Sequence, residues 1–403
     1  MNKKVLYRRM LWTLLLVTVY ILGQFIIIPF VKQSAAAHYL KANTLISILG
    51  MYTGSQTSRP SLLMLGIGPY MTTNIVVQAV SSLDLKSLRQ VSQHTWGIVT
   101  NFLSLIVAIL QAFLYVTNFK KALLPIYIDG YNISFYLAIM VLVTGGMISI
   151  YLANIISERG IGNSAILMVP QLVLSLPSLL IRGWGTSRFN FSIVNLIIVI
   201  LTTLVVVFYG LALIRAEERI PLREPQLMSS FAKSYFPIRL LTAGAMPFMF
   251  STSVFMLVPM LAKNSSSKVK SIIFNIMSID KPSGIVFYAI VIILLNFVFG
   301  LITLQPSVKA RNFKENGSYF YEIVPGMQTE KFIMHKFTRL TWASSLILIV
   351  LSIWPLILGL KWSQMANLTP FIGNLFILIM ILDMIEQEFQ TLNSEKKYVI
   401  DLK

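Results

Sequence analysis

The chain has 403 residues, of which 56% are hydrophobic and 12% are charged. Soluble globular proteins are about 45–50% apolar and about 25% charged, so an ordinary soluble enzyme is excluded. Lysine and arginine number 33 against 15 aspartates and glutamates, which gives a formal net charge of +18. Where this positive charge lies on an otherwise apolar chain is the first question that the sequence raises.

Ten apolar runs are long enough to cross a membrane, since a spanning helix needs roughly 20 such residues. In chain order they are residues 11–30, 62–80, 96–117, 134–156, 163–180, 193–214, 243–261, 284–304, 340–359 and 368–385. The first run follows a basic stretch, as in a signal peptide, but it lacks a small-residue cleavage pattern and is interpreted as a retained helix. The sequence therefore predicts an all-α, multi-pass membrane protein.

The positive charge orients these helices. With a cytoplasmic N-terminus, the cytoplasmic segments hold about two thirds of the 33 lysines and arginines. Because positive residues favour the cytoplasmic side, both termini are predicted to lie inside. Loops 215–239 and 305–339 hold about half of this cytoplasmic charge and also six glutamates. Basic loops can attract anionic lipid, but the interleaved glutamates favour a face that docks a protein.

Ten spans divide into two sets of five. An odd number of spans in each half makes the second half enter the membrane in the opposite orientation, which is the inverted-repeat plan. The predicted halves are residues 1–180 and 181–403. The second and seventh spans are then equivalent, and both contain helix-breaking residues: Gly66, Gly68, Pro69, Gly244 and Pro247. No strong residue-level repeat is evident beyond this shared composition.

One segment between the first and second spans breaks the pattern. Its apolar part, residues 45–52, is too short to cross a bilayer and is followed by small and polar residues. Non-helical backbone at membrane depth is tolerated only where protein or water covers it. Residues 44–58 therefore form either a re-entrant element in a cavity or a plain external loop, and both interpretations stay open.

The sequence contains no motif for enzymatic or metal chemistry. It has no P-loop and no HExxH, and with no cysteine it has no disulfide or thiolate site. Buried ionisable residues mark ion or proton paths, yet the spans are almost free of them, with Asp383 and Glu386 near the inner end of the last span. No catalytic residue, metal or cofactor is predicted. A passage powered by a partner is favoured over an ion-coupled transporter.

Several segments of the sequence can be compared with a known family. They are MYTGSQTSRPSLLMLGIGPYMTTNIVVQ from residue 51, ISERGIGNSAIL from 156, AEERIPL from 216, AGAMP from 243, PGMQTEKF from 325 and FTRLT from 337. These segments resemble the SecY family of protein-conducting channels and lie in family order across nearly the whole chain. The resemblance implies two five-helix halves around an hourglass pore that is closed by a plug and opens sideways to lipid.

The resemblance also implies site residues. The plug would be residues 44–58, including Ile46, Leu49, Met51, Tyr52 and Gly54. The pore ring would comprise Ile67, Met71, Val169, Val173, Met246 and Phe376. The first four form two pairs that are each four residues apart and share a helix face. Branched and thioether side chains can seal a pore against ions by dewetting. Ordinary helix packing is the alternative role for all six.

Partners follow from the same resemblance. They are a SecA-type ATPase motor, small SecE- and SecG-like membrane subunits, an unfolded preprotein with a signal peptide, and the lipid bilayer, with no nucleic acid. The motor would dock on the cytoplasmic loops through Arg219, Arg223, Arg311, Lys314 and Lys331. In the family an arginine that serves the motor usually stands where this chain has Val324.

That departure and the small size make the chain similar to the accessory SecY form of Gram-positive bacteria. The resemblance implies a central channel subunit in the bacterial cytoplasmic membrane, with both termini inside. It would export a dedicated subset of proteins, serine-rich glycosylated surface adhesins. A housekeeping SecY channel and an inverted-repeat secondary transporter are the alternatives.

Overall fold

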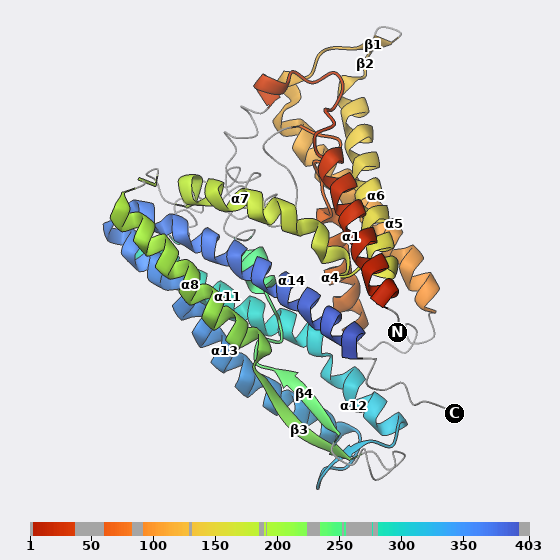
Figure 1. The fold of residues 1–403 in the computed structure, drawn as a ribbon, viewed down its shortest axis with the longest axis vertical. Coiled ribbons are helices and arrows are strands. Elements are labelled where there is room, and N and C mark those ends of the chain that lie inside the picture. The colour runs from red at the N-terminus through yellow and green to blue at the C-terminus, as the bar shows by residue number, and fades with distance from the viewer. Residues whose placement is uncertain are drawn as a thin grey trace. The chain divides into compact units, whose positions relative to one another are not determined.

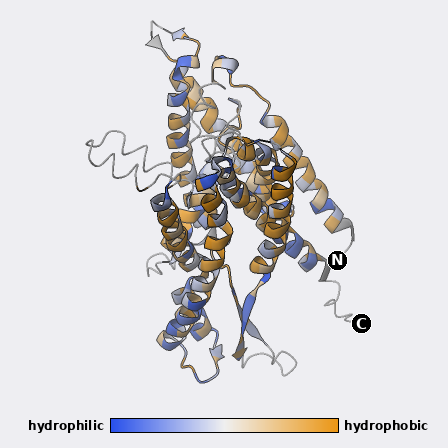
Figure 2. Cartoon of the chain, turned by 90° about the vertical axis from the view of Figure 1, so that its left-hand side faces the viewer, coloured by the Kyte–Doolittle hydropathy of each residue, from blue (hydrophilic) through white to orange (hydrophobic). Residues whose placement is uncertain are grey.

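The computed structural model describes residues 3–36, 60–82, 92–128, 131–184, 189–190, 192–223, 234–251, 254, 276 and 281–394. Within these ranges, eight helices are long and apolar enough to cross a membrane. Figure 2 shows apolar residues along the helix shafts and polar residues near many helix ends. The predicted all-α membrane fold is confirmed. The two predicted spans that are not among the eight are the second and the seventh, which share helix-breaking residues.

The chain divides into two compact units. The first comprises Met1–Val76, Ser92–Leu176 and Ile381–Lys403, and the second comprises Val77–Val91 and Pro177–Met380. Each unit is built mainly of long helices (Figure 1).

The first unit has three long helices, α1 (Lys3–Gly23), α5 (Gln93–Asn118) and α6 (Ser134–Arg159). Its shorter elements are η1 (Lys120–Ala122), β1 (Tyr127–Ile128), β2 (Tyr131–Asn132), η2 (Ser164–Met168) and the first parts of α4 (Gly68–Ser82) and α7 (Val169–Arg182). Small buried residues of α5 and α6, including Ala108, Ala112 and Ala138, pack in one core. Small residues let membrane helices approach closely, which explains this pairing.

The second unit contains α8 (Ile193–Arg215), α11 (Pro282–Leu304), α13 (Met327–Lys361), η4 (Ser363–Asn367) and most of the membrane part of α14 (Leu368–Ser394). α11 and α13 run side by side (Figure 1). A buried polar cluster joins them, in which the Asn296 amide donates to Ser344 Oγ at 3.0 Å and to Ser345 Oγ at 2.8 Å. Such hydrogen bonds hold helices together where apolar surroundings give no hydrophobic driving force.

The two large loops of the second unit, which are predicted to be cytoplasmic, fold into a small mixed domain. Strands β3 (Glu217–Arg223), β4 (Tyr235–Arg239) and β5 (Tyr319–Phe320) form an antiparallel sheet in the order β4-β3-β5, next to α12 (Pro306–Glu315). Along β3, buried Ile220 and Leu222 alternate with outward-facing residues, as expected for a strand with one buried face. They share a core with Phe320, Ile333 and Phe337. After its predicted location we name this the cytoplasmic domain, residues 217–223, 234–239 and 305–339.

Several predicted boundaries are wrong, including the end of the tenth span, which was expected at residue 385 although α14 continues to Ser394. The first span was expected to run to residue 30, but α1 ends at Gly23 and residues 24–29 turn back, so that Ile26 O accepts from Leu62 N at 2.8 Å. Pro29 and Phe30, whose φ is 64°, do not fit a continuing helix. The ninth span was expected to start at residue 340, but α13 already begins at Met327. Its first turns are amphipathic and pack on the cytoplasmic domain, so hydropathy alone did not find them.

Candidate functional site

The second predicted span is not helical from its start. Residues 62–67 form turns, and α4 begins only at Gly68. Gly66 has a φ of 57°, which disfavours a side chain, and its N–H donates to Leu63 O at 3.0 Å. Pro69 lies in the first helical turn, where no N–H is needed. The expected helix 62–80 is therefore replaced by a turn followed by a helix.

The seventh span begins in the same way in the second unit. Residues 240–245 form turns and residues 246–251 are helical. Gly244 has a φ of 61°, and its N–H donates to Leu241 O at 3.2 Å. Met249 N donates to Ala245 O at 3.3 Å, as Met71 N does to Ile67 O at 3.0 Å. The two segments, LMLGIGPYM from residue 63 and LTAGAMPFM from residue 241, thus align without a gap.

This local repeat was missed in the sequence because only leucine, glycine, proline and methionine recur at matching places. A glycine three residues before a proline, with a methionine two residues after the proline, is the signal that could have found it. In this alignment Met249 corresponds to Met71, whereas Met246 corresponds to Gly68. Met249 therefore joins the candidate lining residues, which the sequence analysis did not include.

In the first unit, the turn before α4 is enclosed by protein. Leu63, Met64, Leu65 and Ile67 are all buried. A Cβ atom on Gly145 of α6 would overlap the carbonyl oxygen of Leu62. Non-helical backbone in a membrane protein needs such cover, and the absence of a side chain on α6 allows this close approach.

In the second unit, the corresponding turn contacts α14. Ala245 N donates to Met380 Sδ at 3.0 Å, and a Cβ atom on Gly244 would lie 2.5 Å from Met380 Cε. The thioether is a weak acceptor, and its flexible side chain fills the space beside the glycine. Met380 is thus a positioning residue for the start of the seventh span.

The other ring candidates differ in exposure. Val169 and Val173 lie one turn apart at the start of α7, and Val173 is 50% exposed. Phe376 is fully buried within the second unit, with its ring centroid 5.2 Å from that of Phe248. A Cβ atom on Gly210 of α8 would lie 3.5 Å from the Phe376 ring. These contacts favour helix packing for Phe376, which was the alternative role. The predicted plug, with all five of its named residues, lies outside the described residues.

The loop before α7 is held by two other helices of the first unit. Ile161 N donates to Thr13 Oγ1 of α1 at 2.8 Å, and Gly162 N donates to Glu388 Oε2 of α14 at 2.7 Å. Gly162 has a φ of 90°. Two backbone donors at the entry to a membrane helix are therefore satisfied by side chains.

The motor-docking candidates fall into two groups on the cytoplasmic domain. Arg219 Nε pairs with Glu217 Oε1 at 2.8 Å, and Arg311 pairs with Glu315 at 3.5 Å. The hydrogen bond from Arg219 to Glu217 raises the pKa of the arginine. The other three, Arg223, Lys314 and Lys331, are exposed, and no ion pair joins any of them to the described residues. Of the five candidates, these three therefore carry positive charge that no described carboxylate neutralises.

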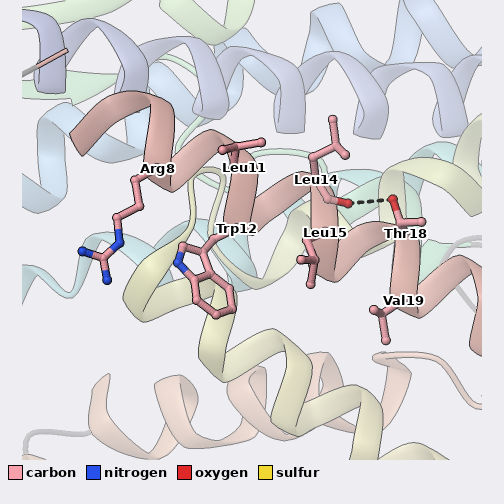
Figure 3. A pocket seen from close by; sticks show the side chains of 7 residues that line it. All are labelled: Arg8, Leu11, Trp12, Leu14, Leu15, Thr18 and Val19. Atoms are coloured by element: carbon pink, nitrogen blue, oxygen red, sulfur yellow. Dashed lines mark hydrogen bonds between the residues drawn. The ribbon is translucent and has the colours of Figure 1, made fainter. Parts of the chain in front are cut away.

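The outer face of α1 carries an apolar groove (Figure 3), lined by Arg8, Leu11, Trp12, Leu14, Leu15, Thr18 and Val19. Its one hydroxyl group is satisfied within the helix, since Thr18 Oγ1 donates to Leu14 O at 2.8 Å. A face of this composition is suited to lipid acyl chains. No three acidic or histidine side chains gather as a metal site among the described residues.

Known proteins resemble this chain over nearly its whole length. It is 28% identical to the accessory Sec system protein translocase subunit SecY2 of Streptococcus parasanguinis, covering 98% of this chain and 97% of that protein. It is also 28% identical to the protein translocase subunit SecY of Haemophilus influenzae, with 96% and 91% covered. A solved structure described as a protein-conducting channel has the same fold, with a TM-score of 0.62, 17% identity, and 100% and 96% of the two chains covered.

The chain also matches the sequence pattern shared by a whole family. The sequence pattern of the SecY family fits residues 61–386, which include both turn-and-helix segments, the loop before α7 and the cytoplasmic domain. Since this match covers well over half of the chain, the protein belongs to the SecY family.

Proposed function

We propose that this protein is the central channel subunit of an accessory Sec translocase, which moves unfolded preproteins across the bacterial cytoplasmic membrane. The observation that carries the proposal is the SecY family match over residues 61–386. Identity does not separate the accessory form from the housekeeping form, since both relatives are 28% identical. The accessory form is favoured because three of the most similar relatives, from Streptococcus parasanguinis, Leuconostoc gelidum and Streptococcus oralis, are accessory Sec system SecY2 subunits.

In this proposal the passage is lined where the second and seventh spans begin. The two five-helix halves, residues 1–180 and 181–403, clamp the pore, and residues 44–58 plug it. Ile67, Met71, Val169 and Val173 contribute to the ring, as does the second unit through Met246 or its neighbour Met249. Pliable thioether and branched side chains can close around polypeptides of differing shape and exclude ions.

A partner supplies the driving force. We propose that a SecA-type ATPase docks on the cytoplasmic domain, where Arg223, Lys314 and Lys331 provide unpaired positive charge among the described residues. Small SecE- and SecG-like subunits complete the complex, and both termini lie in the cytoplasm. The proposed cargo is a dedicated subset of secreted proteins, serine-rich glycosylated adhesins. An ion-coupled transporter is less well supported, because Asp383 is the one buried carboxylate among the described residues.

Site-specific crosslinking tests the channel. The chain contains no cysteine, so Met71→Cys, Met249→Cys and Met246→Cys each introduce one thiol. Phe208→Cys on α8, where the side chain is 71% exposed, is the matched control on an outer face. A preprotein that carries one cysteine and is arrested during export should form disulfides with the first two variants and not with the control. Equal crosslinking at Phe208, or none at any lining position, would contradict the channel. Crosslinking at Met246 with none at Met249 would show that Met246, the residue expected from the sequence, lines the passage in the seventh span.

A further inference from the structure

The loop that joins β5 to α13 is held in one conformation. Phe320 is buried in the cytoplasmic domain, and Ile323 N donates to Phe320 O at 3.1 Å. Both backbone polar groups of Val324 are hydrogen-bonded. Its N–H donates to Gln328 Oε1 at 3.4 Å, and its carbonyl accepts from Thr329 Oγ1 at 3.2 Å. Glu322 adopts a φ of 62°, which costs a residue with a side chain roughly 1 kcal/mol or more. Such a conformation persists only where its surroundings hold it.

This fixed loop presents three large side chains outward. Tyr321 is 70% exposed, Val324 is 62% exposed and Met327 is 73% exposed. We name these residues the apolar triad. A loop that is already fixed has little backbone entropy to lose when a partner covers its side chains. Lys331 is exposed one helical turn after Met327, so the triad has a cationic neighbour.

The length of α13 places the triad outside the membrane. Its 35 residues exceed the roughly 20 that cross a bilayer. The apolar part begins after Arg339, so Met327 lies about 18 Å further along the axis at a rise of 1.5 Å per residue. Even with a tilt of about 40° the height would be about 14 Å, which exceeds the polar interface region of about 7 Å. Lipid therefore does not cover these side chains, and a protein partner is the occupant that fits.

We infer that the apolar triad is the anchor by which the motor ATPase binds, and that the surrounding cations orient it. This inference rests on the proposed function, because it names the chemistry of the proposed docking surface. The complementary surface on the ATPase is an apolar cleft with an acidic rim. Apolar contacts are not screened by salt, whereas exposed ion pairs are. The docking at this loop is therefore expected to persist at high ionic strength.

Binding of the SecA-type ATPase from the same organism to the complete translocase in nanodiscs tests the inference. The double substitution Val324→Ser with Met327→Ser should weaken binding at least about tenfold at both 0.1 M and 0.5 M salt, a loss of about 1.4 kcal/mol or more. Tyr127→Ser is the control, because Tyr127 is a 67% exposed aromatic residue on β1, outside the cytoplasmic domain. Lys314→Glu with Lys331→Glu should weaken binding mainly at low salt.

The outcomes separate the two proposals. Normal binding by the Val324 and Met327 double variant, with loss of binding in the lysine variant, would overturn the triad but leave the motor partner in place. No binding of the ATPase to the unmodified translocase would instead remove the motor from the proposed function. In a Met327→Cys variant, a polarity-sensitive label should report water until the ATPase is added. Quenching of that label by nitroxide lipids without ATPase would show a membrane contact and overturn the triad.

Discussion

The starts of the second and seventh spans share a backbone but differ in what holds them. In both, a glycine with positive φ closes a turn and a proline enters the first helical turn. The first turn is enclosed by buried side chains of its own and by the bare backbone of Gly145. The second turn rests on the adaptable side chain of Met380. Equivalent positions in the predicted inverted repeat thus keep the conformation that interrupts a helix, while the supporting contacts differ.

Among substitutions that test this comparison, that of Gly145 should lower the free energy of unfolding most. A Cβ atom there meets the backbone of Leu62, which cannot move without displacing the turn. Gly145→Ala is expected to lower the free energy of unfolding by about 3 kcal/mol, at the upper end of overpacking costs. Titration with denaturing detergent measures this change.

Gly97→Ala is the matched control, because Gly97 lies in α5 with no atom within 4 Å of the added methyl group. This control should stabilise the helix by about 0.5–1 kcal/mol. A similar stability for the two variants would mean that the turn before α4 is not enclosed as described.

Substitution of Gly244 should have an intermediate effect. Alanine at a positive φ costs about 1–2 kcal/mol, and Met380 must also move, since its Cε would lie 2.5 Å from the new Cβ. We expect a loss of about 2 kcal/mol in unfolding free energy for Gly244→Ala. In a double-mutant cycle, Met380→Ala should recover the part of this loss that comes from crowding. If the two substitutions were strictly additive, Met380 would not be the support of this turn.

Loss of the Met380 thioether alone should lower the free energy of unfolding least. Met380→Leu keeps much of the volume but removes the acceptor of the Ala245 N–H. The expected cost is about 1 kcal/mol, the net value of a typical hydrogen bond. Hydrogen exchange at the Ala245 amide, followed by mass spectrometry, should become faster, whereas exchange at Met71, in the helix that follows the other turn, should not change. Unchanged exchange at Ala245 would show that sulfur does not protect it.

Local sequence patterns were sufficient for the regular parts of the fold. The runs 96–117, 134–156, 193–214 and 284–304 lie within three residues of the observed helices at both ends. These helices are uniformly apolar, so hydropathy finds them directly. The sheet of the cytoplasmic domain was not expected, because β3 has only two inward-facing residues and pairs with β5, which is almost a hundred residues later in the chain.

The candidate site could be predicted only in part from the sequence. The helix-breaking residues of the second and seventh spans marked the right places, but hydropathy treated both spans as continuous helices. The ion pairs of Arg219 and Arg311 depend on local side-chain geometry that charge counting does not describe. For Phe376, the resemblance suggested a pore residue, whereas its neighbours Phe248 and Gly210 come from two other helices.

The sequence by itself determined that this is a multi-pass membrane protein and contained the segments that resemble the SecY family. Its bias in positive charge predicted the orientation of the helices. These properties depend on composition and order along the chain. Only the tertiary structure decided where the two interrupted helices begin, what supports each turn, and which side chains of the cytoplasmic domain are left for a partner. Those features depend on contacts between residues far apart in sequence, such as Gly145 with Leu62 and Met380 with Ala245.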